Sequence, residues 1–189
     1  MNSNFRAILA RNNFVVLDTE TTGLEKPAEI VQVGIIDGPT GNVLLDTYVY
    51  PFKPIPPDAT AIHGITPEMV KYAPIWTVVR KQVLEIIAGK DVVVYNAVYD
   101  RKLMHWSDEA WGDDHIDYKA NATWHCAMEA YAEYYGDWND YRHSYRWQSL
   151  GNAMRQQRMP VDPNVHSALA DAQMTLQLIR HCCKEQSNV

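Results

Sequence analysis

An apolar run that ends in two acidic residues most limits how this chain can fold: Phe14-Val-Val-Leu-Asp18-Thr-Glu20. Four consecutive apolar residues followed by acids predict a buried strand with a polar end. Residues two apart in a strand point to the same face, so Asp18 and Glu20 project together. Paired acids in that position repel each other and lose hydration, and a divalent cation is one common compensation. Taken alone, however, the pattern favours an exposed strand end with solvated acids.

The three residues that follow, Thr21-Thr22-Gly23, favour a ligand beside the two acids. Small side chains and a glycine let a phosphate group approach backbone N–H groups closely. The end of this strand is therefore a candidate phosphate-binding site.

The rest of the chain predicts an α/β fold with a mixed sheet. Strands are expected at Ile30–Asp37 and 42–49, which form an antiparallel meander with the first strand, and at 91–95, which is apolar enough for a central position. Thr66 and the proline after it predict the start of a short helix. Apolar spacing and the residues typical of helix ends predict further helices at 75–87, 99–106, 124–135, 150–157 and 168–183. Connections are expected at 51–57, at 107–118 (an acidic exposed loop or ragged helix), at 137–145 and at 159–165. This order fits one three-layered domain over residues 1–189.

Composition limits the compartment and the mode of binding. No apolar run is long enough to cross a bilayer, and residues 1–12 lack the basic start and apolar core of a secretory signal. Three irregularly spaced cysteines are typical of reduced thiols, so a cytoplasmic protein with no membrane partner is expected. The net charge of −6 argues against gripping nucleic acid by bulk electrostatics. It remains compatible with a carboxylate site whose negative charge is offset by bound cations.

Three further residues are candidates for the same site: Asp100, His166 and Asp171. Asp100 follows a predicted strand at the start of a helix, where a carboxylate can simply complement the positive helix end. His166 and Asp171 are five residues apart, so within one helix their side chains would point about 140° from each other. They can share a site only if His166 lies in the preceding loop, where Pro160 and Pro163 put the chain.

Four segments of this chain occur in the order Asp18-Thr-Glu20-Thr-Thr-Gly-Leu24, Ile62-His-Gly-Ile-Thr66, Asn96-x-x-x-Asp100 and His166-x-x-x-x-Asp171. Together they resemble the DEDDh, DnaQ-like exonuclease family, which includes proofreading epsilon subunits of bacterial polymerases, exonuclease X, ribonuclease T and the three-prime repair exonucleases. The match runs from about Phe14 to Arg180, nearly the whole chain. The resemblance implies an RNase H-like fold with a five-stranded sheet of order 3-2-1-4-5.

The resemblance also implies a 3′–5′ exonuclease that hydrolyses phosphodiester bonds at a nucleic-acid 3′ end and releases nucleoside monophosphates. Two divalent cations would be held by Asp18, Glu20, Asp100 and Asp171, and oxygen ligands favour Mg²⁺ or Mn²⁺ over zinc. Such a pair stabilises the attacking and leaving oxygens of an in-line displacement. His166 would take a proton from the attacking water, because histidine exchanges protons near neutral pH.

A seat for the terminal nucleotide is implied by the same resemblance. Its residues are Thr21, Thr22, Gly23 and Leu24, with Leu24 packed against a base and His63 and Asn96 nearby. Two positions depart from the family pattern Gly-His-Asn-x-x-Phe-Asp, because Tyr95 and Tyr99 replace the histidine and the phenylalanine. Tyr99 keeps the aromatic bulk, whereas Tyr95 is expected to alter contacts near the second metal. Neither change removes a carboxylate.

Two neighbouring segments are candidates for substrate selection. Five of the six tryptophans lie within residues 106–147, and residues 141–160 carry four arginines and no acid, interleaved with aromatic residues. Arginines and exposed aromatics hold single strands by charge and base stacking. We therefore expect Arg142 and Arg146 to guide a single strand toward the metals. The alternative is that these aromatic residues fill the core.

Several readings of the function stay open from the sequence. A DNA exonuclease is favoured, with DNA repair as one of its open roles, and an RNA-trimming exonuclease is the first alternative, because 2′-hydroxyl contacts leave no motif. A proofreading subunit is less favoured, because only residues 184–189 follow the last predicted helix, so no polymerase partner is implied. A binding module without catalysis would be expected to lack a carboxylate or His166, and all five are present. A zinc hydrolase lacks the required His and Cys spacing. The oligomeric state is open.

Overall fold

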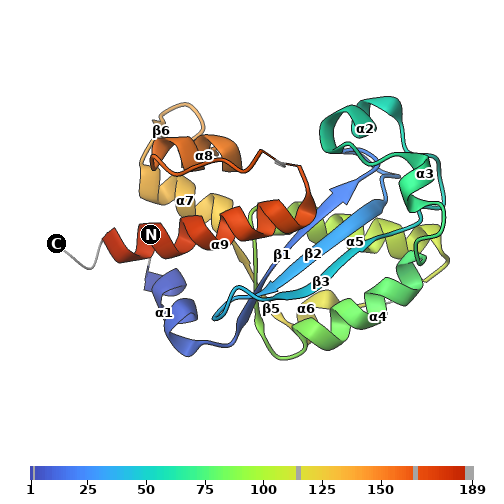
Figure 1. The fold of residues 1–189 in the computed structure, drawn as a ribbon. Helices are drawn as coiled ribbons and strands as arrows, with labels where there is room; N and C mark the ends of the chain where they lie inside the picture. Colours follow the sequence, from blue (N-terminus) through green and yellow to red (C-terminus); the bar gives the residue numbers. More distant parts are fainter. Residues whose placement is uncertain (2, 114–115, 164–165, 186–189) are drawn as a thin grey trace.

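A five-stranded sheet forms the centre of the molecule (Figure 1). The computed structural model describes residues 1, 3–113, 116–163 and 166–185. The sheet has the order β3-β2-β1-β4-β5 and comprises β1 (Phe14–Thr21), β2 (Ile30–Asp37), β3 (Val43–Tyr48), β4 (Asp91–Val94) and β5 (Thr123–Cys126). The first three strands form the predicted antiparallel meander, and β4 and β5 run parallel to β1. The predicted order 3-2-1-4-5 is therefore confirmed.

Helices cover both faces of the sheet, and the side chains of β1 alternate between two cores. Phe14 and Val16 point into the core formed with α1 (Ser3–Arg11), α7 (Ala127–Tyr135), α8 (Leu150–Gln156) and α9 (Ala168–Glu185). Val15 and Leu17 point into the core formed with α4 (Trp76–Ile87), α5 (Ala97–Ala110) and α6 (Tyr118–Asn121). Because side chains alternate along a strand, the same alternation directs Asp18 and Glu20 toward the α9 side.

The acidic stretch 107–118 differs from its prediction as an exposed loop or ragged helix. Helix α5 continues through Ala110, and Asp108 is completely buried. Its carboxylate accepts hydrogen bonds from Trp76 Nε1 at 2.7 Å, Arg80 Nη1 at 2.9 Å and Tyr118 Oη at 2.8 Å. The prediction is wrong here because an acid can be buried when a cation and other donors are buried with it. Residues 114 and 115 lie outside the described residues.

Residues 123–126 form an edge strand, so the predicted helix 124–135 begins late, at Ala127. All four residues pair with β4, and this tertiary pairing overrides the helical spacing of the local sequence. The predicted connection 137–145 contains a small hairpin of β6 (Trp138–Asn139) and β7 (Ser144–Tyr145). Helix α1 and helix α2 (Pro57–His63) occupy stretches in which the sequence analysis predicts no helix.

The other predicted helices are present, with shifted ends. Helix α3 (Pro67–Val70) begins after Thr66, whose hydroxyl accepts a hydrogen bond from the backbone N–H of Met69, and α7 ends at Gly136 with a φ of 80°. The predicted loop 159–165 is confirmed over 159–163, and residues 164 and 165 lie outside the described residues. Within the described part of the chain, no helix has the length and apolar character needed to cross a membrane.

Candidate active site

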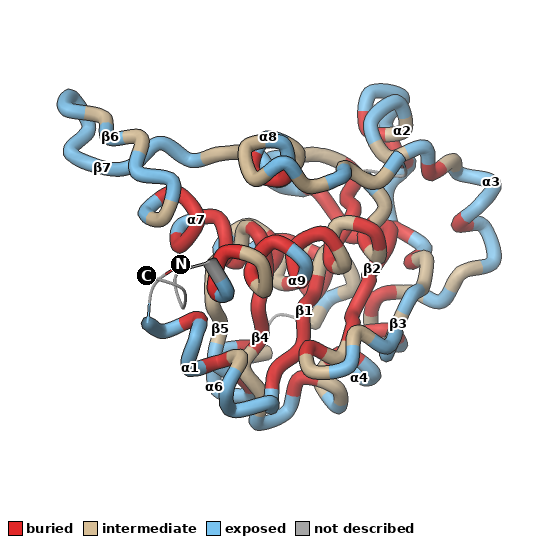
Figure 2. Tube along the Cα trace, turned by 60° about the vertical axis from the view of Figure 1, so that its left-hand side comes forward, coloured by how far each residue is buried: buried red, intermediate tan, exposed pale blue. Residues whose placement is uncertain are grey.

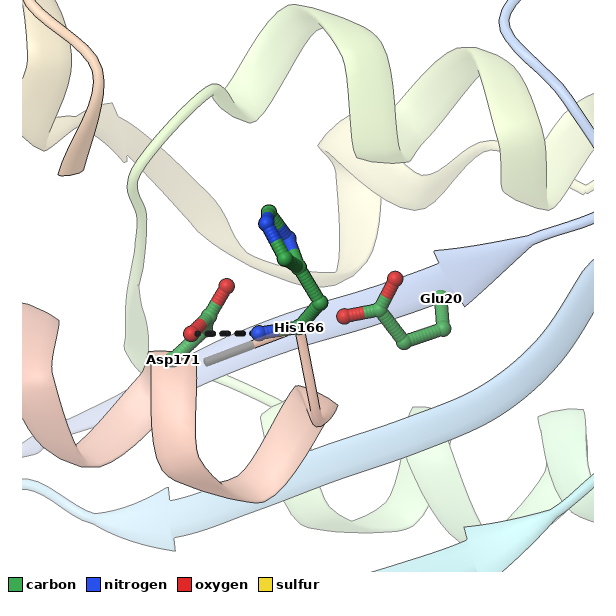
Figure 3. A group of neighbouring side chains, drawn as sticks. All are labelled: Glu20, His166 and Asp171. Atoms are coloured by element: carbon green, nitrogen blue, oxygen red, sulfur yellow. Dashed lines mark hydrogen bonds between the residues drawn. The ribbon is translucent and has the colours of Figure 1, made fainter. Parts of the chain in front are cut away.

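Two acids at the end of β1 face the first turn of α9. The ligand atoms of Glu20, His166 and Asp171 all lie within 4.8 Å of one another. Figure 3 shows the Glu20 carboxylate directed toward Asp171, with His166 between them in this view. The backbone N–H of His166 donates to Asp171 Oδ1 at 3.4 Å. Three of the predicted site residues, from two segments far apart in the sequence, are thus neighbours in space.

A glycine in β2 lets the start of α9 reach the sheet. Gly34 pairs with Asp18 across the strands, and a Cβ atom at Gly34 would lie 2.6 Å from backbone atoms of Ala168 and Leu169. The side chain of Gln32 adds a second tie, because its Oε1 accepts a hydrogen bond from Ala168 N at 3.2 Å. Neither residue was predicted to belong to the site, although a glycine inside an apolar strand is a signal for close backbone approach.

The loop before α9 has the arrangement that the sequence analysis required. His166 precedes the helix, which begins at Ala168, and Asp171 lies in its first turn with its N–H bonded to Ser167 O at 2.9 Å. His166 is exposed and has a φ of 71°, a left-handed conformation that is uncommon outside glycine. The predicted placement of His166 in the loop and Asp171 in the helix is confirmed.

The fourth acid comes from the helix that follows β4, the strand parallel to β1. Asp100 lies in the first turn of α5, 4% exposed, and its Oδ1 accepts a hydrogen bond from Thr19 Oγ1 at 2.7 Å. All four acids line one cavity of about 160 Å³. The other residues that line this cavity are Thr19, Tyr95, Asn96, Tyr99, Leu150 and His166.

Crowding and burial make these carboxylates difficult to ionise in the absence of a cation. Burial, reinforced by Asp171 and Asp100, raises the pKa of Glu20 to about 8. Burial raises the pKa of Asp100 to about 7 in spite of the Thr19 hydroxyl, and it also raises the pKa of Asp171. Burial together with its three acidic neighbours raises the pKa of Asp18 well above its ordinary value. No ion pair among the described residues involves any of the four, so their charge is left for a ligand to neutralise.

Stability without metal should therefore fall as the pH rises. A carboxylate whose pKa is higher in the folded state stabilises the fold below the unfolded pKa of about 4, and this contribution is lost as the pH rises through the folded value. With folded pKa values of about 7 and 8 for Asp100 and Glu20, the loss should occur between about pH 5 and pH 8.5. Urea unfolding in EDTA would measure it, and Mg²⁺ at pH 8.5 should restore the lost stability.

A variant with fewer acids separates this effect from other titrations. The lowered pKa of His63, caused first by burial, acts in the opposite direction, because its contribution is lost as the pH falls. The double variant Asp18→Asn/Asp100→Asn keeps His63 and should show a flatter decline than the wild type. A wild-type stability in EDTA that is constant or rises from pH 5 to 8.5 would contradict the prediction.

The candidate nucleotide seat is held in place by two side chains from other elements. Tyr99 Oη donates to Gly23 O at 2.7 Å, and Thr21 Oγ1 donates to the same carbonyl at 2.9 Å. His63 Nδ1 accepts from the N–H of Ile65 at 3.0 Å, so its Nε2 carries the proton and donates to Thr21 O at 3.2 Å. Tyr99 thus does more than keep the aromatic bulk of a phenylalanine, because its hydroxyl fastens the loop.

The other residues predicted to bind the terminal nucleotide differ in how accessible their side chains are to a ligand. Thr22 closes the loop from inside, because its N–H donates to Glu29 O at 2.8 Å and its Oγ1 accepts from Glu29 N at 2.9 Å. Leu24 is 76% exposed and is free to pack against a base. Asn96 makes no side-chain capping bond to α5 and lines the cavity.

Tyr95 contacts a segment that follows the hairpin. It is 7% exposed, and its Oη donates to Gln148 O at 2.8 Å. This bond ties the chain just before α8 to the cavity, which Leu150 also lines.

Comparisons with known proteins agree with this geometry. The family model RNase_T, described as Exonuclease, matches residues 15–179. The exonuclease CP81 of Escherichia phage 186 is 42% identical over 167 residues, which cover 87% of this chain and 85% of that protein. The epsilon subunit of DNA polymerase III from Pasteurella multocida is 33% identical over 102 residues, which cover 49% of this chain and 40% of the subunit.

Solved exonuclease structures share the fold. Exonuclease X in complex with 5′-overhanging duplex DNA aligns with a TM-score of 0.68 and 24% identity over 92% of this chain and 93% of that chain. The zinc-bound form of the E. coli exonuclease I complex with single-stranded DNA aligns with a TM-score of 0.74 and 17% identity over 94% of this chain and 42% of that chain. Fold and site together define an exonuclease of RNase H-like architecture. The chain belongs to the DEDDh, DnaQ-like exonuclease family.

Proposed function

We propose that this chain is a metal-dependent 3′–5′ exonuclease that removes nucleoside monophosphates from the 3′ end of a nucleic acid, DNA rather than RNA, and that residues 1–189 form one catalytic unit. The observation that carries the proposal is the meeting of four carboxylates and His166 at one cavity, where Glu20 and Asp100 are buried and Asp18 and Asp171 are half-buried. A cluster of acids with raised pKa values and no ion-pair partner among the described residues fits a pair of hard cations bound through oxygen.

Each side chain has a role that follows from its position. Asp18, Glu20 and Asp171 would hold one Mg²⁺ or Mn²⁺, and Asp18 would share a second with Asp100. When bound, the cations supply charge stabilisation to the attacking and leaving oxygens of the phosphodiester. His166, exposed at the rim and next to Asp171, takes the proton of the attacking water.

The nucleotide seat orients the 3′ end over these carboxylates. Leu24 packs against the terminal base, and the loop of Thr21, Thr22 and Gly23, held through the Gly23 carbonyl, lies beside the sugar and phosphate. Asn96, which precedes α5 and lines the same cavity, contributes an amide that makes no capping bond to the helix. His63 positions the loop by binding the Thr21 carbonyl. The structural likeness to exonuclease X in complex with DNA supports the choice of DNA as substrate.

Labelled oligonucleotides test the reaction directly. With DNA and RNA strands labelled at either end, we expect immediate release of a mononucleotide from the 3′ label and a shortening ladder from the 5′ label. EDTA should abolish cleavage, and Mg²⁺ or Mn²⁺ should restore it. Internal cleavage, release from the 5′ end or activity that persists in EDTA would contradict the proposal, and faster loss of the RNA would overturn the choice of DNA.

A further inference from the structure

A hollow outside the candidate active site lies on the small hairpin β6–β7 and the two residues that follow it. Its volume is about 380 Å³, and it is lined by Asn139, Arg142, Ser144, Tyr145, Arg146 and Trp147. We call this feature the hairpin hollow. Figure 2 shows the hairpin extending from the body of the molecule, with most of its length exposed.

The aromatic side chains at the hairpin are presented to solvent. Tyr141 is 93% exposed and Trp147 is 67% exposed. Trp138 and Tyr145 stack edge to face across the two strands, with ring centroids 5.1 Å apart, and so support the hollow from within the hairpin. The tryptophans earlier in the chain are less exposed. Trp106, Trp111 and Trp124 pack against the core that the sheet forms with α4, α5 and α6. The alternative that the aromatic residues of this region pack in the core is therefore correct for those three tryptophans and wrong for Tyr141 and Trp147.

The charge of the hairpin hollow is positive on a chain whose net charge is −6. Arg142 and Arg146 line it and no acidic residue does, although Asp140 lies exposed in the adjacent turn. Arg146 has a long contact of 3.6 Å with Asp137, a half-exposed pair that contributes little and can be exchanged for a phosphate. The arginine side chains thus complement an anionic ligand, and the exposed rings complement flat apolar groups.

The hairpin hollow is joined to the candidate active site by a short, fixed segment. Trp147 lines the hollow and Leu150 lines the carboxylate cavity, so three residue steps separate them. Their Cα atoms are therefore at most about 10 Å apart. Tyr95 holds the segment between them through its bond to Gln148 O. At about 3.4 Å per stacked nucleotide, this upper limit corresponds to roughly three nucleotides or fewer.

We propose that the hairpin hollow binds the single-stranded part of the substrate a few nucleotides 5′ of the scissile bond. Arg142 and Arg146 contact the phosphates, and Trp147 stacks on a base. This inference rests on the proposed exonuclease function, because it gives the strand its direction. The surface is sequence-independent, because every base offers a stacking face and every nucleotide a phosphate. It would allow an acidic protein to hold a polyanion locally.

Binding in EDTA tests the hairpin hollow without any cleavage. Fluorescence anisotropy with a labelled 12-mer, as DNA and as RNA, would compare the wild type with Arg142→Ala/Arg146→Ala and with Trp147→Ala. We expect Kd to rise about tenfold for the double variant and at least about fivefold for Trp147→Ala, the lower end for loss of one stacked base. The slope of log Kd against log salt should fall by about 1.4 for the loss of two phosphate contacts.

Two controls show whether an effect on binding is specific to the hairpin hollow. One tests the general loss of positive charge, and the other tests the link to cleavage at the catalytic centre. The matched variant Lys81→Ala/Lys119→Ala removes two exposed cations from α4 and α6, on the opposite side of the sheet, and should leave Kd and the salt slope near wild type. In Mg²⁺, the wild type should gain in kcat/KM between a dinucleotide and a 12-mer, and the hairpin variants should lose this gain.

The possible results separate the two proposals. An unchanged Kd and salt slope in the hairpin variants overturns the assignment of the hollow to nucleic acid and leaves it as a protein-docking surface. Loss of binding in those variants, from a wild type that degrades no substrate in any metal, supports the hollow and overturns the exonuclease proposal. If the hairpin variants bind only the DNA or only the RNA more weakly than the wild type does, that nucleic acid is the one that the hollow binds.

Discussion

Replacing Asp18 with asparagine should slow 3′-end degradation by at least about 1000-fold. Asp18 has Glu20, Asp100 and Asp171 as electrostatic neighbours, so it is the acid best placed to touch both proposed cations. A metal ion supplies several kcal/mol of transition-state stabilisation, and a loss of about 4 kcal/mol corresponds to a factor of about 1000 in rate. Single-turnover cleavage of a 5′-labelled strand in Mg²⁺ measures the chemical step without product release.

The same substitution should make the metal-free protein more stable at pH 8.5, because it removes one of four mutually repelling carboxylates whose pKa values are raised by burial. Inactivity combined with higher stability in EDTA is hard to attribute to misfolding. The control Glu85→Gln makes the same carboxylate-to-amide change at an exposed position on α4 and should leave the rate unchanged. A rate for Asp18→Asn within tenfold of the wild type would remove Asp18 from the metal site.

Replacing Asp108 with alanine should destabilise the fold by about 3–5 kcal/mol, the cost of leaving a buried charge without its partner. Asp108 is fully buried, and it is the acceptor for Trp76, Arg80 and Tyr118. Without it, Arg80 keeps only the partly exposed Asp113, and two further donors are left unsatisfied. Urea unfolding at pH 7 with Mg²⁺ present would measure the loss.

Two comparisons make the interpretation of Asp108 specific. Glu109→Ala removes the next residue on the same helix, whose partner Lys26 is on the surface, and should cost less than about 1 kcal/mol. The apolar double variant Arg80→Met/Asp108→Leu removes both charges and should be more stable than Asp108→Ala. If Asp108→Ala and Glu109→Ala cost the same, the buried network contributes no special stability.

Local sequence patterns determined much of this protein. The apolar run before Asp18, the meander and the long last helix follow from spacing that each segment carries within itself. The two prolines before His166 were enough to predict that the histidine lies in a loop and Asp171 in a helix, because proline breaks helices locally. The order of the motifs predicted the sheet order through family resemblance.

Contacts between distant segments decided the rest. The burial of Asp108 depends on Arg80, the strand at 123–126 depends on β4, and the closeness of α9 to Asp18 depends on Gly34 and on a hydrogen bond from Ala168 to Gln32 across 136 residues. Contacts also decided which aromatic residues are buried. Trp124 packs against the core and Trp147 is exposed, although both are tryptophans, because their neighbours in the fold differ. Periodicity reports which side chains share a face of one element, whereas burial and the pKa values of the four acids arise only when separate elements meet.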